Sequence, residues 1–268
     1  MAARPITFLS DYGLGDEFVG VVHAVIAHEC PTARIIDLSH GVPRQSVLAG
    51  ALMLARALPY APPGVHLAVV DPEVGARRRA VALRTALDDR LLVGPDNGLL
   101  LPAAERFGWV TEAVEISTSS WRLEPVSATF HGRDLFAPVA ARLAAGEALA
   151  DAGTPLDPDE LVRLELPEPR KGRKKGQLVA HAMVVDGFGN VQLDARPSDL
   201  EAARLGREVA VGNGRSARYL RTFADAEPGE LLLYEDATGM LALAVNGGWA
   251  VRELGGLEPG DEVRLLPS

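Results

Sequence analysis

The chain has 268 residues, of which 47% are hydrophobic and 24% charged, and its formal net charge is −9. This composition is typical of a folded globular protein and excludes disorder or a collagen-like structure for the whole chain, while a single cysteine, Cys30, excludes an intrachain disulfide. The negative charge disfavours nucleic-acid binding. The sequence contains no run of ~18 apolar residues that would predict a membrane span, and no apolar signal core precedes Asp11. We therefore expect a cytoplasmic protein without a membrane partner.

Residues 1–166 alternate between short apolar runs and segments with helical periodicity. This alternation predicts an N-terminal α/β domain, in which a mostly parallel sheet is flanked by helices. The run 65–70 is almost wholly apolar, as expected for a strand buried on both faces. The expected strands are 6–9, 34–38, 65–70, 81–84 and 90–93, and the expected helices are 18–27, 47–58 and 135–145.

Residues 167–176 read Pro-Glu-Pro-Arg-Lys-Gly-Arg-Lys-Lys-Gly, which predicts a linker between two domains. Its basic run could bind an anionic partner, but a solvated linker is favoured because the chain is acidic and no aromatic residues interleave. Residues 177–268 carry short apolar runs separated by Gly, Asn and Asp turns, which predicts a small barrel or sandwich. The expected strands there are 178–186, 208–211, 230–234, 240–245 and 262–266.

Polar residues follow three of the expected N-terminal strands: Asp11, Asp71 and the pair Asp96–Asn97. Ligands of open α/β sheets bind outside the carboxyl ends of the strands, so these turns could share one site. Asp and Asn also favour turns for purely structural reasons. For the Asp96–Asn97 turn, which is flanked by Pro and Gly, the structural role is favoured.

Three clusters carry side chains suited to chemistry. Asp11, with Asp16 five residues later, could bind a ribose diol or simply form a turn. Asp71 precedes three arginines, 77–79, which could form a charged pocket or face solvent. His131 opens an apolar helix in the segment Thr-Phe-His-Gly-Arg-Asp, where an acid–base role and a structural role are equally plausible.

Motifs of several other enzyme classes are absent from the sequence. It has no Walker A loop, no GxGxxG after the first strand, no GxSxG elbow, and neither HExxH nor a CxxC pair. We therefore expect neither a metal nor a bound cofactor. The remaining histidines show no recognisable metal spacing: His23, His28, His40, His66 and His181.

Six segments occur in order over nearly the whole chain: SDYGLGDEFVG (10–20), DPEVGARRR (71–79), GPDNGLL (94–100), TFHGRDLFAPVAA (129–141), DGFGN (186–190) and LALAVNGGWA (241–250). Each segment alone is a weak signal, whereas the ordered set is specific. By these segments the sequence resembles the S-adenosyl-L-methionine hydroxide adenosyltransferases, which are hydrolase relatives of the fluorinating and chlorinating enzymes.

The resemblance implies an N-terminal α/β domain followed by a C-terminal β-barrel. It also implies a homotrimer that binds S-adenosyl-L-methionine where the N-terminal domain of one subunit meets the C-terminal domain of its neighbour. The catalytic residues would be Asp71, Arg78 and His131, because the family arginine lies seven positions after the aspartate.

The resemblance also implies the substrate contacts. Asp11 would hold the ribose hydroxyls, Asp16 in the same segment would also bind the substrate, and Asp186 would pair with the methionine ammonium group. Phe188 and Asn190 would line the adenosine pocket, and Val245, Asn246 and Gly247 would meet the adenine edge.

The sequence departs from the family pattern at three positions. Glu73 stands where the family usually has Gly, and Ala76 where it has Thr. Ala237 replaces a serine that contacts the methionine, and Thr238 or Asp236 could substitute for it.

The implied reaction is attack of water on ribose C5′ of S-adenosyl-L-methionine, which gives adenosine and L-methionine. Arg78 stays protonated and cannot act as the base, so Asp71 or His131 would accept the proton, and the sequence does not choose between them. The alternatives are a non-catalytic binder of S-adenosylmethionine or adenosine, and a chlorinase-like halogenase. The fluorinating enzyme has aromatic Tyr at the position of Asp71 and Tyr-Ser at His131–Gly132, which favours the water-using branch.

Overall fold

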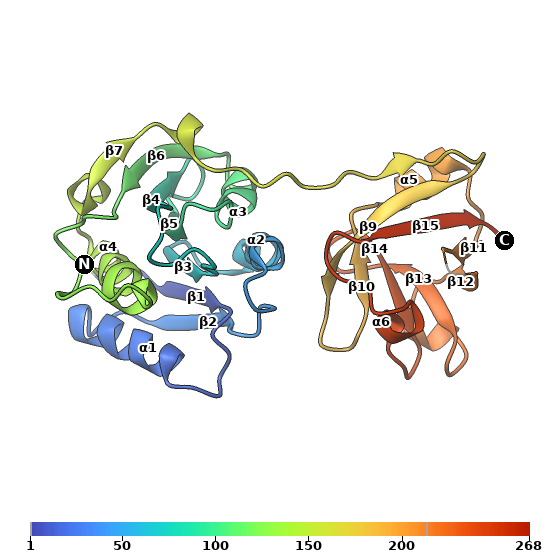
Figure 1. Cartoon of the computed structure of the whole chain (residues 1–268), viewed down its shortest axis with the longest axis horizontal. Helices are drawn as coiled ribbons and strands as arrows, with labels where there is room; N and C mark the ends of the chain where they lie inside the picture. Colours follow the sequence, from blue (N-terminus) through green and yellow to red (C-terminus); the bar gives the residue numbers. More distant parts are fainter. Residues whose placement is uncertain (1, 213) are drawn as a thin grey trace. The chain divides into compact units, whose positions relative to one another are not determined.

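The computed structural model describes residues 2–212 and 214–268. The chain divides into two compact units, Met1–Leu164 and Glu165–Ser268 (Figure 1). None of the helices within the described residues is both apolar enough and long enough to span a membrane.

The first unit is built on a seven-stranded sheet with the order β2-β1-β3-β5-β4-β6-β7. The pairings along β2-β1-β3-β5 are parallel. The remaining pairings are antiparallel, and β4 and β5 form a hairpin through the short turn 86–90. The strands are β1 (Ile6–Ser10), β2 (Ile35–Ser39), β3 (Val65–Val69), β4 (Ala80–Thr85), β5 (Leu91–Pro95), β6 (Val110–Glu115) and β7 (Thr154–Leu156).

Helices cover both faces of this sheet. Successive side chains of a strand point to opposite faces: Phe8 packs in the hydrophobic cluster that includes α1 and α4, whereas Leu9 packs in the cluster that includes α2 and α3. The helices are α1 (Phe18–Glu29), α2 (Val47–Ala57), α3 (Leu101–Arg106) and α4 (Ala137–Ala145). Short 3₁₀ turns cover η1 (Leu58–Tyr60), η3 (Leu149–Ala152) and η4 (Pro158–Glu160).

Local signals in the sequence set the ends of two of these helices. The Ser46 side chain accepts a hydrogen bond from the Ala49 backbone N–H and so caps the start of α2. Gly146 ends α4 in the left-handed region, at φ 106°, which a residue with a side chain adopts at a cost.

The second unit is a β-barrel closed by the pairing of β9 with β10. Its seven strands run in the order β10-β14-β13-β12-β11-β15-β9, and β8 adds to the outside of β9. The strands are β8 (Arg170–Lys171), β9 (Leu178–Val185), β10 (Val191–Leu193), β11 (Glu208–Val211), β12 (Arg215–Tyr219), β13 (Leu231–Glu235), β14 (Leu241–Val245) and β15 (Glu262–Pro267), with α5 (Pro197–Ala203), α6 (Ala250–Glu253) and the 3₁₀ turn η5 (Phe223–Asp225) between them.

The predicted fold class is confirmed: an α/β sheet domain is followed by a smaller all-β barrel. Part of the predicted linker has regular structure, because Arg170 and Lys171 of the basic run pair with β9.

Candidate active site

The order of the strands reverses between β1 and β3. From β1 the chain passes through α1 to β2 on one side, and then returns to β3 on the other side of β1. Ligands of open α/β sheets bind where the strand order reverses in this way. β1 and β3 are parallel and in register, with Ser10 opposite Val69. Asp11 and Asp71 therefore leave adjacent strands at the same edge of the sheet.

Arg78 binds the Asp71 carboxylate through both sides of its guanidinium fork. Its Nε donates to Oδ1 at 2.9 Å and to Oδ2 at 3.0 Å, and its Nη2 also donates to Oδ2. The side chains are only 4% and 5% exposed, so the ion pair is almost fully removed from solvent. This bidentate arrangement fixes both groups in one orientation.

The loop that joins Asp71 to Arg78 makes a tight turn. The Ala76 N–H donates to the Glu73 carbonyl at 2.9 Å, and Gly75 adopts the left-handed backbone conformation, with φ 77°. A Cβ atom at Gly75 would lie 2.2 Å from the Ala128 carbonyl oxygen. The departures Glu73 and Ala76 both lie on the exposed side of this turn.

His131 completes a hydrogen-bonded group of three. Its Nδ1 lies 2.8 Å from Arg78 Nη2. Because a guanidinium only donates hydrogen bonds, Nδ1 must accept, and the neutral ring carries its proton on Nε2. Burial and the neighbouring Arg78 charge lower the pKa of His131 below its ordinary value, so the ring is neutral at neutral pH.

His131 directly precedes a π-helical turn, η2 (Gly132–Phe136), which continues into α4. Buried Asp134 anchors this turn by accepting from the Ser127 N–H at 2.7 Å and pairing with Arg133. Single π-turns of this kind occur frequently at functional sites.

Tyr12 contacts the same turn and was not singled out from the sequence. A Cβ atom at Gly132 would lie 2.1 Å from the Tyr12 hydroxyl oxygen, so only glycine lets the phenol approach. Burial, with the nearby Asp11 and Asp71 carboxylates, raises the pKa of Tyr12 above its ordinary value. Its place directly after Asp11 was the available signal.

The remaining predicted residues of the first unit have different surroundings. Asp11 is half-buried and its Oδ2 accepts from the Gln45 N–H at 2.8 Å. Asp16 is exposed on the turn before α1. The third strand-end turn is structural, because Asp96 binds the Arg79 side chain and the Val162 N–H.

In the barrel, the predicted residues lie on two turns, and the first of them contacts the segment that directly follows the second. The turn after β9 is held by Asp186, whose Oδ1 accepts from the N–H groups of Phe188 and Asn190 at 2.9 Å each. The Gly189 carbonyl accepts from the Val251 N–H at 3.0 Å, and a Cβ at Gly189 would lie 3.0 Å from Trp249.

These two barrel turns combine buried and exposed groups. Val245 is buried at the end of β14, the Asn246 amide donates to the Ala226 carbonyl at 2.8 Å, and Gly247 is exposed. Phe188 and Trp249 are 79% and 46% exposed, which is unusual for large aromatic side chains. Trp249 was not singled out from the sequence.

Ala237, which stands where the family pattern has a serine, has polar neighbours. Beside Ala237, the Thr238 hydroxyl and the Asp236 carboxylate both accept from the Gln192 amide, and Thr238 Oγ1 donates to Asp236 Oδ1 at 2.7 Å. Tyr234 lies nearby, and burial together with the charge of Asp186 raises its pKa to about 12. These groups are engaged with one another rather than left open by the substitution.

Comparisons with known proteins give one consistent result. The model of the SAM hydroxide adenosyltransferase N-terminal domain matches residues 6–153, and that of the C-terminal domain matches residues 180–264. The chain is 53% identical to the (R)-S-adenosyl-L-methionine hydrolase of Salinispora tropica, over 99% of each chain. It is 30% identical to a fluorinase of Actinoplanes sp., over 90% of each chain. Among solved structures, an uncharacterized conserved protein from Thermotoga maritima matches with a TM-score of 0.86 and 36% identity, covering 97% of this chain and 99% of that one.

Proposed function

Because this chain belongs to the SAM hydroxide adenosyltransferase family, we propose that it hydrolyses S-adenosyl-L-methionine to adenosine and L-methionine. The observation that carries the proposal is the hydrogen-bonded group Asp71–Arg78–His131, in which Asp71 and Arg78 are almost fully buried. A protein that only binds the ligand has no need of this group.

The chemical problem is to make water a sufficient nucleophile. Water attacks C5′ while the C5′–S bond breaks, and the bonding electron pair leaves on sulfur, which becomes the neutral thioether of methionine. The leaving group is good, but bulk water has a pKa of about 15.7 and attacks poorly without help. Holding water in line with the C5′–S bond can contribute roughly 7–11 kcal/mol.

We propose a separate role for each of the three side chains, and their hydrogen bonds support it. Arg78 is a permanent donor and stabilises the developing hydroxide. His131 accepts from Arg78 at Nδ1, so its free Nε2–H group donates to the water oxygen and fixes its position. Asp71 is the anionic group of the three and accepts the proton that the water loses. No metal and no bound cofactor takes part in this scheme.

Substrate recognition is assigned to both units. Asp11, with Asp16, takes the ribose end, Asp186 takes the methionine ammonium group, and Phe188, Asn190 and the Val245–Gly247 turn take the adenosine. In the homotrimer that the family resemblance implies, the barrel of one subunit supplies these contacts to the N-terminal domain of its neighbour. The exposed aromatic rings of Phe188 and Trp249 support this proposal, because such surfaces are usually covered by a ligand or partner. We further propose that the protein acts in the cytoplasm.

Product analysis tests the proposal directly. Purified protein is incubated with S-adenosyl-L-methionine, with and without chloride, and the products are separated by liquid chromatography. We expect equal amounts of adenosine and L-methionine, independent of chloride. A 5′-chloro-adenosine product would assign the protein to the halogenating branch. Binding of S-adenosyl-L-methionine without turnover would show that the protein is a non-catalytic binder. Sedimentation or light scattering of the same sample tests the trimer.

A further inference from the structure

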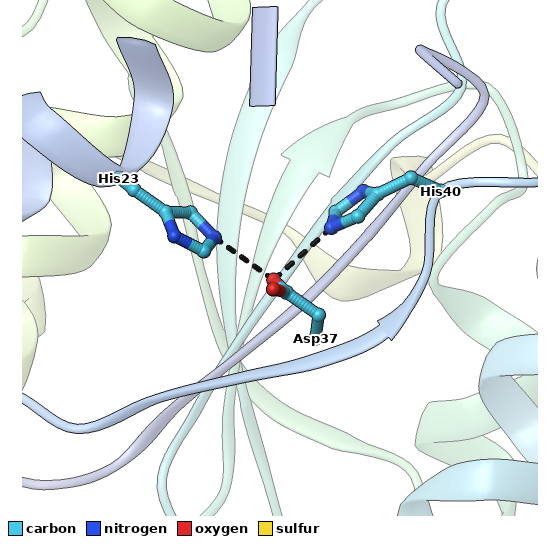
Figure 2. A group of neighbouring side chains, drawn as sticks. All are labelled: His23, Asp37 and His40. Atoms are coloured by element: carbon cyan, nitrogen blue, oxygen red, sulfur yellow. Dashed lines mark hydrogen bonds and ion pairs between the residues drawn. The ribbon is translucent and has the colours of Figure 1, made fainter. Parts of the chain in front are cut away.

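Three side chains with the chemistry of metal ligands converge on one point beside the central sheet (Figure 2). His23 comes from α1, Asp37 from the middle of β2, and His40 from the loop that follows β2. Their ligand atoms all lie within 4.8 Å of one another. Both imidazole Nε2 atoms face the same carboxylate oxygen, Asp37 Oδ1, at 2.9 Å for His23 and 3.0 Å for His40.

His40 is held in place from its other ring nitrogen. Its Nδ1 lies 2.8 Å from the Ser10 hydroxyl, and its side chain is 3% exposed. A hydrogen bond at Nδ1 is the usual means by which a protein orients a histidine so that Nε2 binds a metal.

The Nε2 atom of His40 is close to Asp37 but poorly aligned with it. Within residues 2–212 and 214–268 this buried atom makes no hydrogen bond of acceptable geometry. A buried imidazole nitrogen without a partner loses the free energy of its contact with water. A cation placed between the three side chains would satisfy it.

The surroundings suit an ion that exchanges with solvent. The His23 and Asp37 side chains are 33% and 43% exposed, so an ion can reach the site and keep a water ligand. On the inner side the Phe8 ring lies 4.6 Å from the His40 ring and 6.1 Å from the His23 ring, centroid to centroid. This apolar wall keeps water away from one half of the site.

We propose that His23, Asp37 and His40 form a zinc-binding site. Two imidazoles and one carboxylate, with water as a fourth ligand, are a set that Zn²⁺ accepts, whereas Mg²⁺ and Ca²⁺ prefer oxygen ligands. Tetrahedral Zn²⁺ with ligands at ~2.0–2.2 Å separates the ligand atoms by roughly 3.4 Å, so each N–O pair needs to open by only about half an ångström.

The bound ion would stabilise the turn that carries Asp11. The His40 carbonyl accepts from the Gly13 N–H at 2.8 Å, and its ring binds Ser10, so His40 holds both ends of the segment Ser10–Gly13. Fixing His40 through zinc therefore fixes the end of β1. The sequence alone did not indicate this site, because its ligands follow no motif and meet only through the packing of α1 against β2.

Zinc titration of the full-length, tag-free protein tests the site. The protein is treated with a chelator, dialysed and titrated calorimetrically with Zn²⁺, and with Mg²⁺ for comparison. We expect one Zn²⁺ per chain and no Mg²⁺ binding. His23→Ala should weaken zinc binding more than about tenfold, since even loss of a residue that only orients a ligand costs ~10–100-fold. His28→Ala is the matched control, because His28 is an exposed histidine on the same helix.

Two further measurements protect the result from a folding artefact. His23 is partly exposed, so His23→Ala should keep the far-ultraviolet circular dichroism of the parent. Co²⁺ in place of zinc should give visible absorption bands that His23→Ala and Asp37→Asn abolish and His28→Ala keeps. Absence of stoichiometric zinc binding in the parent, or equal affinity in folded His23→Ala, would overturn the proposal. None of these readouts depends on turnover of S-adenosylmethionine.

Discussion

The two units of the chain hold their predicted site residues in opposite ways. In the α/β unit, Asp71 and Arg78 are almost completely buried and bind each other through several hydrogen bonds. In the barrel, Asp186 and Phe188 are exposed, and their turn is fixed mainly by bonds to its own backbone. The residues proposed to act on water are thus held by one another within the α/β unit, whereas Asp186 and Phe188, proposed to recognise the substrate, lie on an exposed turn.

This difference fits the separate roles proposed for the two sets of residues, catalysis for the buried set and substrate recognition for the exposed set. Catalytic groups gain from being held rigidly, since they then need no rearrangement as charge develops. Recognition groups must remain accessible until the ligand arrives. Substitutions in the two units should accordingly have different effects on turnover, affinity and stability.

The largest effect is expected from Arg78→Ala. It removes the proposed hydroxide-stabilising group, and we expect kcat to fall by ~10²–10³, as for loss of one donor to a developing oxyanion. The variant also leaves Asp71 buried without its partner, which typically costs ~3–5 kcal/mol of folding free energy. Activity assays and urea unfolding measure the two effects. Exposed Arg77→Ala is the control, and equal activity of Arg78→Ala and the parent would refute the assignment.

Gly132→Ala tests how tightly the α/β unit holds its site. The added Cβ would meet the Tyr12 hydroxyl at 2.1 Å, so we expect a loss of ~1–3 kcal/mol in the free energy of unfolding. Combining it with Tyr12→Phe, which removes that oxygen, should recover part of the loss. The control is Gly20→Ala on α1, where a Cβ meets nothing within 4 Å. A stable Gly132→Ala variant would show that the turn adapts freely.

Lowering the pH should decrease the free energy of unfolding of the α/β unit, because buried His66 stays neutral in the folded state. This ring is fully buried, and burial with the Arg90 charge lowers its pKa to about 3. The unfolded chain takes up a proton below about pH 6.5, whereas the folded unit does not until about pH 3. Stability is therefore lost as the pH falls through this window, by about 2 kcal/mol at pH 5.

Urea unfolding between pH 7.5 and pH 5 measures this loss. In Trp249→Phe the remaining tryptophans, Trp109 and Trp121, both lie in the α/β unit and report on it alone. An unchanged midpoint over this range would contradict the buried neutral state of His66.

The smallest effect on folding is expected from Phe188→Ala. The ring is 79% exposed, so the free energy of unfolding should change by less than ~0.5 kcal/mol. Loss of a ring that stacks on adenine should raise KM for S-adenosylmethionine about tenfold, within the usual ~1–3 kcal/mol of such stacking. Tyr60→Ala, an exposed aromatic of the other unit, is the control. An unchanged KM would remove Phe188 from the site.

The fold class was predictable because the main strands are apolar runs at regular intervals. Strands such as β1 and β3 are buried along their whole length, so their composition reveals them. Strand β12 was missed because, of its five residues, only Ala217 is buried, and β10 because it has only three residues. Such strands are defined by their neighbours in the barrel rather than by their own hydrophobicity.

The site was predictable only in part. The resemblance to the family, confirmed by the comparisons, led to Asp71, Arg78 and His131, and the structure brings these three side chains together. Tyr12 was not singled out, and His23 and His40 show no metal spacing in the sequence, because tertiary packing alone brings these side chains to their partners. No spacing rule connects His23 on a helix with Asp37 on a strand.

The outer strands of the two sheets have features that prevent backbone hydrogen bonding to a strand of another copy of the chain. Pairing of β9 with β10 closes the barrel, and only the two-residue strand β8 adds to its outside among residues 165–212 and 214–268. The α/β sheet does have two outer strands. On one, β7 is short and carries Pro155, which lacks an N–H group; on the other, β2 carries the charged Asp37 at its centre. Proline and charge at such positions discourage edge-to-edge aggregation. Asp37→Val should therefore make the protein more prone to aggregate, quite apart from any effect on metal binding.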